Sequence, residues 1–304
     1  MKKRILGLVI IGFLALAYFN RAMRLTDSTF TAPVPTPAVS RMVLDLKQWK
    51  KWWPGNQLAD SVFSIDGRAL RVHHFLLTGF DATDTATGTG FRVSFVTASQ
   101  TETIFTIRPL HPATNSTLGK LKHWQAIRSL QGLCNKYMNS LKSYFSSIPA
   151  VYEFHIEQKK VINSPHISIS REFNGKPNVD DLYGMIDQLR VYIGSQNRKA
   201  VDDPIMNMLE ESGKFKVMVA LATDTILPST DQYKLKQMVL GNILIAEVKG
   251  GPERIKACTD QMQRYVSDFG KSSPAIPFQR LITDRRAEPD STKWITTINY
   301  PVFQ

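Results

Sequence analysis

Residues 240–253, LGNILIAEVKGGPE, decide the architecture of the second half of the chain. The run Leu240–Lys249 is rich in apolar and β-branched side chains and predicts a β-strand. Gly250 and Gly251 end this strand, and Pro252 suits the first turn of a helix. Apolar side chains then recur at helical spacing. They are Ile255, Cys258, Met262, Val266 and Phe269.

The same order of elements occurs earlier in the chain. A strand-like run, Lys160–Phe173, precedes a helix that opens near Pro177 with acidic residues in its first turn, where the helix dipole favours them. Two strands are expected after each helix. These four are Ile205–Glu210, Lys214–Thr223, Ile276–Thr283 and Trp294–Tyr300. The sequence therefore predicts a duplicated strand-helix-strand-strand fold over residues 150–304.

Three segments of this half carry a family resemblance. They are VKGGP at 248–252, PFQRLITD at 277–284 and KWITTINYPV at 293–302. Together they resemble the C-terminal half of a gyrase-inhibitor-like, or AraC-type effector-binding, domain. The resemblance implies two units side by side with a ligand cleft between them. It also implies a role as an effector-binding module of a regulator, a stand-alone small-molecule binder or, in a subset, a hydrolase of small reactive compounds.

The resemblance assigns candidate ligand-binding residues one by one. Phe278 matches an aromatic position of the family, and Trp294 matches the aromatic before the final strand. Gln279 stands where the family has an acid, and Leu281 stands where it has a tyrosine. Because an amide cannot carry charge or take a proton, Gln279 argues against cation binding and hydrolysis. The alternative is a cleft filled by Leu281 and its neighbours, with Trp294 as a packing residue.

The first half predicts a different arrangement. A helix starts at Thr36-Pro37 and ends at the segment Trp49–Gly55, β-rich runs follow from Val62 to Pro109, and a long amphipathic helix covers Leu118–Phe145. This order resembles the bacterial SRPBCC (START/polyketide-cyclase-like) superfamily over residues 38–148, although no strand is evident before the first helix. The resemblance implies a helix-grip-like antiparallel sheet with an apolar cavity.

Trp49, Trp52 and Trp53 are the candidate ligand-binding residues of this domain. The alternative is that they are core and rim aromatics at the end of a helix. His73 and His74 lie in a predicted strand, so we expect their rings on opposite faces and unable to share a metal ion. We predict no catalytic residues, no metal site and no cofactor, because none of the familiar catalytic motifs is present.

The N-terminal residues 1–25 predict a transmembrane anchor or a signal peptide. The uncharged run Ile5–Phe19 follows Lys2, Lys3 and Arg4. It is short for a membrane span, and a cleaved signal is the alternative. The flanking cations favour a single-pass protein of the cell membrane with a cytoplasmic N-terminus and extracytoplasmic domains. Cleavage would give a secreted or periplasmic protein. Residues 26–37, which contain three prolines, are expected to form an extended spacer.

Charge is concentrated in the first half of the 304-residue chain. Of a net charge of +12, residues 1–152 carry 18 Lys and Arg against 7 Asp and Glu, which is +11, and residues 153–304 carry 20 against 19, which is +1. This asymmetry favours an anionic membrane surface as a partner. Direct nucleic acid binding is not expected, because no helix-turn-helix segment is evident.

The function predicted from these features is binding of a small apolar or amphipathic ligand by a membrane-anchored α+β protein without an evident catalytic site. A second hypothesis is a hydrolase that uses the C-terminal cleft, with Glu172, Glu247 or Tyr192 as the replacement acid or base. A third is a structural or interaction protein whose clefts are closed.

Overall fold

The computed structural model describes residues 26–110, 124–161, 164–238 and 240–303. The chain divides into two compact units, the first ending at Ser147 and the second beginning at Ile148. Each unit holds one antiparallel sheet with helices packed on it, so the expected mixed α+β class is confirmed.

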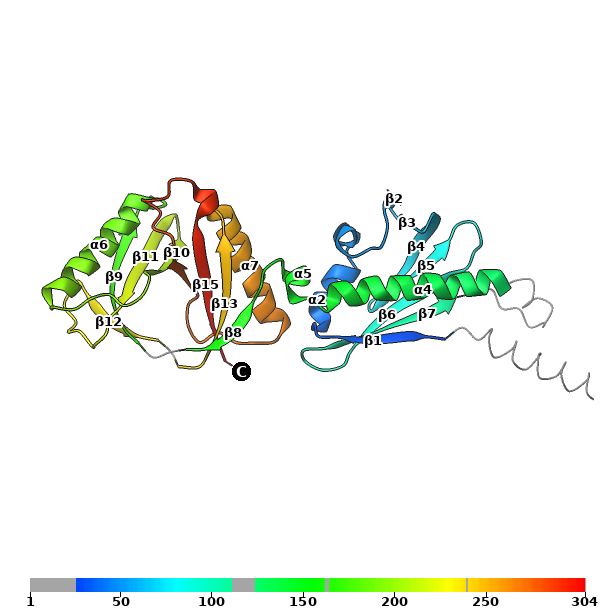
Figure 1. Ribbon diagram of the computed structural model, residues 1–304, viewed down its shortest axis with the longest axis horizontal. Coiled ribbons are helices and arrows are strands. Elements are labelled where there is room, and N and C mark those ends of the chain that lie inside the picture. The colour runs from blue at the N-terminus through cyan, green and yellow to red at the C-terminus, as the bar shows by residue number, and fades with distance from the viewer. Residues whose placement is uncertain (1–25, 111–123, 162–163, 239, 304) are drawn as a thin grey trace, which may run out of the picture. The chain divides into compact units, whose positions relative to one another are not determined.

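Unit 1 contains a seven-stranded sheet in the order β1-β7-β6-β5-β4-β3-β2. Its strands are β1 (Ser28–Ala32), β2 (Gln57–Ala59), β3 (Val62–Ile65), β4 (Arg68–Leu76), β5 (Gly79–Asp84), β6 (Gly90–Thr97) and β7 (Thr103–Leu110). Its helical segments are α2 (Thr36–Val43), η1 (Leu46–Lys51) and α4 (Trp124–Phe145). The long helix α4 runs along the sheet and packs on β1 and β7 (Figure 1).

The segment expected to be a spacer belongs to this sheet. Strand β1 pairs antiparallel with β7, from Ser28 opposite Ile107 to Ala32 opposite Thr103. The ring of Phe30 stacks on that of Phe105 with centroids 4.9 Å apart. The prediction that residues 26–37 form an extended spacer ahead of the first folded unit is therefore wrong for its first part. Alternation of Thr and Phe suits a half-buried strand, and this outweighs the prolines that follow it.

Unit 2 contains an eight-stranded sheet in the order β12-β9-β11-β10-β14-β15-β13-β8. Its strands are β8 (Glu157–Lys160), β9 (Pro165–Phe173), β10 (Ile205–Glu211), β11 (Lys214–Ala222), β12 (Lys234–Gln237), β13 (Asn242–Lys249), β14 (Phe278–Leu281) and β15 (Ile295–Val302). Its helical segments are α5 (Ile148–Tyr152), α6 (Val179–Ser195), α7 (Pro252–Asp268) and η2 (Ser291–Lys293).

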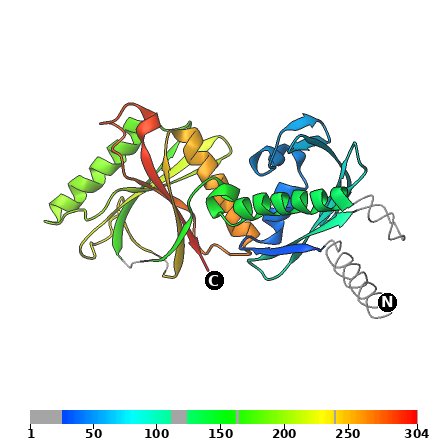
Figure 2. The same ribbon diagram turned by 45° about the vertical axis from the view of Figure 1, so that its right-hand side comes forward.

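The duplication predicted from sequence is visible in this sheet. One repeat is β9-α6-β10-β11 and the other is β13-α7-β14-β15, and each has an added edge strand, β12 or β8. Helix α6 packs on β9 and β11, while α7 packs on β13 and β15. Figure 2 shows the sheet curling as it passes from one repeat to the other. The repeats join where β10 pairs with β14.

The two principal helices of unit 2 begin differently. Asn178 caps α6 by accepting a hydrogen bond from the Asp181 backbone N–H at 2.8 Å, and the Asp181 carboxylate accepts one from the Asn178 N–H at 2.9 Å. This reciprocal pair is a capping box. Helix α7 begins at Pro252 after Gly251, which offers no side chain to cap it. The first N–H groups of α7 therefore lack a side-chain acceptor at the cap position.

The expected membrane localisation requires correction. No helix within the described ranges is both long enough and apolar enough to cross a membrane. The anchor or signal expected over residues 1–25 lies outside the described residues.

Candidate functional site

Trp49, Trp52 and Trp53 lie in the packed interior of unit 1. Their exposed fractions are 0%, 3% and 6%. The Trp49 ring centroid is 4.5 Å from that of Phe80, and the Trp53 centroid is 5.0 Å from that of Tyr137. The indole N–H groups donate to backbone carbonyls: Trp49 to Val43 at 2.8 Å, Trp52 to Met42 at 3.1 Å and Trp53 to Ser64 at 3.0 Å. This is the core role weighed as the alternative, and their role in ligand binding stays a prediction.

His73 and His74 depart from their expected geometry. The pairing of β4 with β5 shifts register between His73 and Leu76, and His74 has a φ of 50°. This bulge places the two rings together, with centroids 4.5 Å apart and the two Nδ1 atoms 3.0 Å apart. The expectation of rings on opposite faces is wrong, because strict alternation holds only while a strand stays regular.

The three candidate residues of unit 2 are divided between two faces of the sheet. Phe278 and Gln279 are consecutive in β14, so their side chains point in opposite directions. Gln279 and Trp294 line a groove on the side that carries α6 and α7. Phe278 lines a cavity on the other side. The structure therefore brings two of the candidates together and separates the third.

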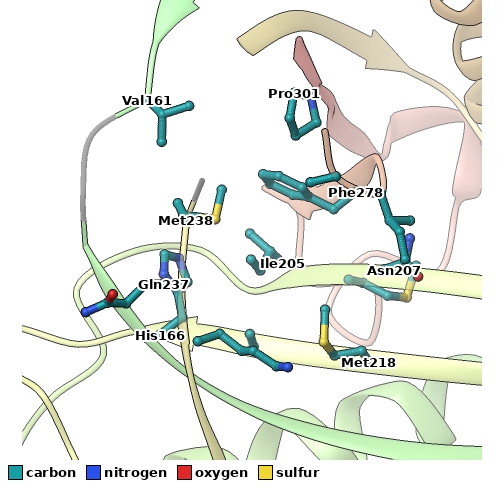
Figure 3. Close-up of a pocket in the computed structure, with 14 residues that line it drawn as sticks. Val161, His166, Ile205, Asn207, Met218, Gln237, Met238, Phe278 and Pro301 are labelled. Carbon is teal, nitrogen blue, oxygen red and sulfur yellow. The ribbon is translucent and has the colours of Figure 1, made fainter. Parts of the chain in front are cut away.

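The cavity around Phe278 has a volume of about 380 Å³ and mostly apolar walls. Figure 3 shows the Phe278 ring directed into it, with Met218 and Met238 nearby. His166 is its buried polar member, and its Nδ1 lies 2.9 Å from the carbonyl oxygen of Ser164. Burial lowers the pKa of His166 below its ordinary value, so the ring is neutral at neutral pH. A methionine-rich cavity whose buried histidine is neutral suits an apolar guest.

The groove between α6 and α7 has a volume of about 510 Å³ and a different character. Its apolar walls come from both repeats and include Val179, Leu182, Met206, Met208, Pro252 and Ile255. The N-terminal ends of both helices border it, at Asn178 and at Pro252. The first turns at these two ends already carry acids, Asp180 and Asp181 in α6 and Glu253 in α7, which complement the helix dipoles.

Charged side chains in this groove are mostly cationic. Lys176, Lys256 and Arg285 line it together with one acid, Asp260. Asp260 is already engaged, since its Oδ2 lies 2.7 Å from the Lys256 Nζ. Arg285 is 8% exposed, and burial lowers the pKa of its guanidinium. The groove therefore has a buried cation at its wall and no spare carboxylate among the described lining residues.

Arg285 has few polar contacts for a buried guanidinium. Its carbon Cζ lies 4.6 Å from the ring centroid of Trp294, and its Nη2 donates to Thr296 Oγ1 at 3.1 Å. Its backbone N–H donates to the hydroxyl of Tyr183 at 2.8 Å. Within the described part of the chain, no carboxylate lies within ion-pair distance of it. A guanidinium carries five N–H donors, so most of them remain available.

Sequence reasoning missed Arg285, and only a weak signal pointed to it. Arg285 and Arg286 are adjacent in a polar loop, and the sequence alone does not distinguish the role of one from that of the other. The structure separates them, because Arg286 is partly exposed and pairs with Asp187 at 2.7 Å. The acids and the tyrosine suggested for a hydrolase also lie elsewhere. Glu172, Glu247 and Tyr192 are not lining residues of the cavity or of the groove.

Comparisons with known proteins give structural neighbours. No protein-family model matches the chain, and no curated protein matches it. The crystal structure of the EcmrR C-terminal domain covers 50% of this chain and 98% of its own, with 15% identity and a TM-score of 0.41. The EcmrR–DNA complex covers 62% of this chain and 69% of its own, with 14% identity and a TM-score of 0.44.

A third neighbour is SAV2435 bound to tetraphenylphosphonium. It covers 49% of this chain and 93% of its own, with 14% identity and a TM-score of 0.35. These structures have TM-scores below 0.5, so they carry no argument about the fold of residues 150–304. At this level of identity no ligand or activity carries over from them. The SRPBCC-like domain stays a prediction.

Proposed function

We propose that unit 2 is a non-catalytic binding module for a small amphipathic molecule that carries an anionic group, seated in the groove between α6 and α7. The observation that carries the proposal is the buried guanidinium of Arg285, which has no carboxylate partner among the described residues. The proposal keeps the predicted amphipathic ligand and adds the sign of its charge.

The physical argument starts from the cost of an unpaired buried charge. Burying an ion without a partner is expensive, and stacking on Trp294 offsets that cost only in part. A carboxylate, sulfonate or phosphate beside Arg285 would supply the missing partner, and guanidinium binds such groups through paired hydrogen bonds. Gln279 lines the same groove and adds a neutral donor.

The remaining groove explains why the ligand should also be apolar. Leu182, Met208 and Ile255 line it, and about 510 Å³ is within the range of small-molecule sites. The acid expected at the position of Gln279 is absent. A cationic ligand would therefore meet the guanidinium of Arg285 with no compensating charge at Gln279.

The test compares two fluorescent probes of similar shape and different charge. Anilinonaphthalene sulfonate is anionic and N-phenylnaphthylamine is neutral, and both brighten on leaving water. We expect the purified full-length protein to bind the sulfonate, and Arg285→Met to weaken that binding about tenfold or more. Tetraphenylphosphonium serves as the cationic competitor and should not displace the sulfonate. Equal sulfonate affinity in the wild type and in Arg285→Met would contradict the proposal.

A second candidate function rests on the cavity around Phe278. Its methionines favour a neutral apolar molecule, and Lys236, an exposed residue of the edge strand β12, is its one charged member among the described lining residues. Binding of N-phenylnaphthylamine that survives Arg285→Met and is lost in Phe278→Ala would support this site. Both candidate functions are binding functions.

The finer assignments remain proposals of the same kind. We infer that unit 2 belongs with effector-binding domains, that unit 1 is helix-grip-like, and that neither binds duplex DNA directly. The sheet order β1-β7-β6-β5-β4-β3-β2 with α4 across it supports the second of these. A gel-shift assay with duplex DNA at low and high salt tests the third, since electrostatic binding would appear at low salt.

A further inference from the structure

The bulge in β4 of unit 1 brings together side chains that a regular strand would separate. His74 is one of the few non-glycine residues with a left-handed backbone, at a φ of 50°. Such a conformation costs free energy, and bulges that re-aim side chains are often found beside functional sites. The left-handed backbone of His74 therefore makes its imidazole ring a candidate functional group.

Three potential metal ligands meet at this bulge. The Nδ1 atoms of His73 and His74 are 3.0 Å apart, and His74 Nδ1 is 3.6 Å from Asp81 Oδ2. All three ligand atoms lie within 4.8 Å of one another. Two ligands at tetrahedral angles on zinc are about 3.3 Å apart, given Zn–N bonds of about 2.0–2.1 Å. The observed separations bracket that value.

We propose that His73, His74 and Asp81 form a binding site for one Zn²⁺, or another divalent ion that prefers imidazole, on unit 1. Two imidazoles and one carboxylate are a common ligand set for zinc. The side chain of His74 is 73% exposed and that of Asp81 is 5% exposed. One side of the site therefore opens to solvent, which gives the ion a way in and leaves coordination positions for water.

Neighbouring groups hold the ligands in suitable states. His73 Nε2 lies 2.7 Å from Thr83 Oγ1. If Nε2 donates this hydrogen bond, His73 Nδ1 presents its lone pair to the site, which is the arrangement usual for a metal-bound histidine. Thr83 lies on β5 two residues beyond Asp81, so one strand supplies both a ligand and a support for another ligand.

Asp81 is oriented by Arg92 on the next strand. Arg92 Nε donates to Oδ1 at 2.7 Å and Nη2 donates to Oδ2 at 2.8 Å. Each carboxylate oxygen has a second lone pair that can face the ion. The positive charge of Arg92 opposes the metal, so we expect the site to bind more weakly than one without this arginine.

The decisive variant is His74→Gly. Glycine adopts a φ of 50° without strain, so the change removes one ligand and should leave the bulge intact. We expect a competition titration with a chromophoric chelator to show zinc bound to full-length protein. In His74→Gly the dissociation constant of that ion should rise about tenfold or more. Zinc should also raise the thermal midpoint of the wild type and not that of the variant.

The matched control is His155→Ala in unit 2. The side chain of His155 is also 73% exposed and lies beside a carboxylate, with Nε2 3.0 Å from Glu157 Oε1, yet it has no second histidine next to it. His155→Ala should bind zinc as the wild type does. His74→Asn, which also tolerates a left-handed backbone, gives the same reading if the glycine variant does not fold. Unchanged zinc affinity in the His74 variants, or no zinc bound by the wild type, overturns the proposal.

Discussion

The guanidinium of Arg285 lies over the indole ring of Trp294, with Cζ 4.6 Å from the ring centroid. The contact joins a loop residue to the residue that precedes β15. It gives the groove between α6 and α7 a flat cationic surface backed by an aromatic ring. The same contact leaves a buried charge without a carboxylate partner in the described ranges, so binding and stability should respond to it in opposite directions.

Arg285→Met tests this opposition. Methionine keeps the length and apolar packing of the side chain and removes the charge, so the ligand-free protein should gain about 1 kcal/mol in the free energy of unfolding of unit 2. The same change should weaken the binding of anilinonaphthalene sulfonate. Urea unfolding followed by a probe of unit 2, with and without the sulfonate, measures both effects.

The neighbouring residue provides the control. Arg286 pairs with Asp187 at 2.7 Å and lies over the Tyr183 ring at 4.7 Å. Arg286→Met should lower stability by up to about 1 kcal/mol, because it breaks a partly exposed ion pair. It should leave sulfonate binding unchanged. A loss of stability in Arg285→Met equal to that in Arg286→Met would show that the buried guanidinium is compensated.

Phe278→Ala should separate the two cavities of unit 2. The Phe278 ring is directed into the cavity on the face away from α6 and α7 (Figure 3). Its removal should weaken N-phenylnaphthylamine binding at that cavity and leave the affinity for the sulfonate within about twofold of the wild type. Fluorescence titration of each probe against the wild type and against Phe278→Ala measures these affinities. Parallel losses of both probes would place them in one site.

Tyr137→Phe should stabilise unit 1. Tyr137 is 0% exposed, and its hydroxyl has no hydrogen-bond partner among the described residues. Burial alone raises its pKa well above the ordinary value, so no ionised form contributes. An unsatisfied buried hydroxyl is unfavourable, and its removal should add about 1 kcal/mol to the free energy of unfolding. Thermal and urea unfolding of the variant measure the change.

Tyr152→Phe is the opposite case in unit 2. Its hydroxyl donates to Asp268 Oδ2 at 2.9 Å, and both residues are buried. This variant should lose about 1–2 kcal/mol, because a buried carboxylate loses a donor. Equal effects of the two tyrosine variants would contradict the assignment of one hydroxyl as satisfied and the other as unsatisfied.

His166 predicts how the stability of unit 2 depends on pH. Burial lowers its pKa in the folded state, and the hydrogen bond with the Ser164 carbonyl opposes this shift only in part. In the unfolded chain the pKa is about 6.5. Above that pH the folded state keeps its full stability, and as pH falls below it the unfolded state binds the proton first. Stability should therefore decrease on acidification until pH passes the folded pKa.

His166→Phe should flatten this dependence. The replacement has no titrating group and suits a largely apolar cavity. Urea unfolding of the wild type and the variant across the range from about pH 7.5 to 5 measures the slope. Identical slopes in the two proteins would assign the dependence to other groups.

The duplicated fold of unit 2 could be predicted from sequence because its signals are local and repeated. Alternating apolar residues, helix-starting prolines and glycine breaks recur in the same order, as in residues 240–253. Strand β1 was missed because a short strand gains its stability from pairing with β7, far away in the sequence. Prolines close to it suggested an extended spacer instead.

The sites were harder to predict for reasons that individual residues make plain. Phe278 and Gln279 were placed in one cleft by analogy, although neighbours in a strand face opposite sides. Arg285 was missed because its burial depends on Trp294 and Thr296, not on its own sequence context. The His73–His74 pair was excluded by the rule of alternation, and the bulge that overrides it follows from the register with β5.

The two repeats of unit 2 are joined by a short ladder between β10 and β14. The neighbouring strands β10 and β11 share seven residue pairs, whereas β10 and β14 share two, Ile205 with Arg280 and Met206 with Gln279. Met206 and Gln279 also line the groove, so the groove lies over the pair of strands at which the two halves of unit 2 meet. A ligand bound in the groove would contact both halves beside the two residue pairs that β10 and β14 share. Occupancy would therefore add contacts across the join at which the two repeats are held by the fewest residue pairs.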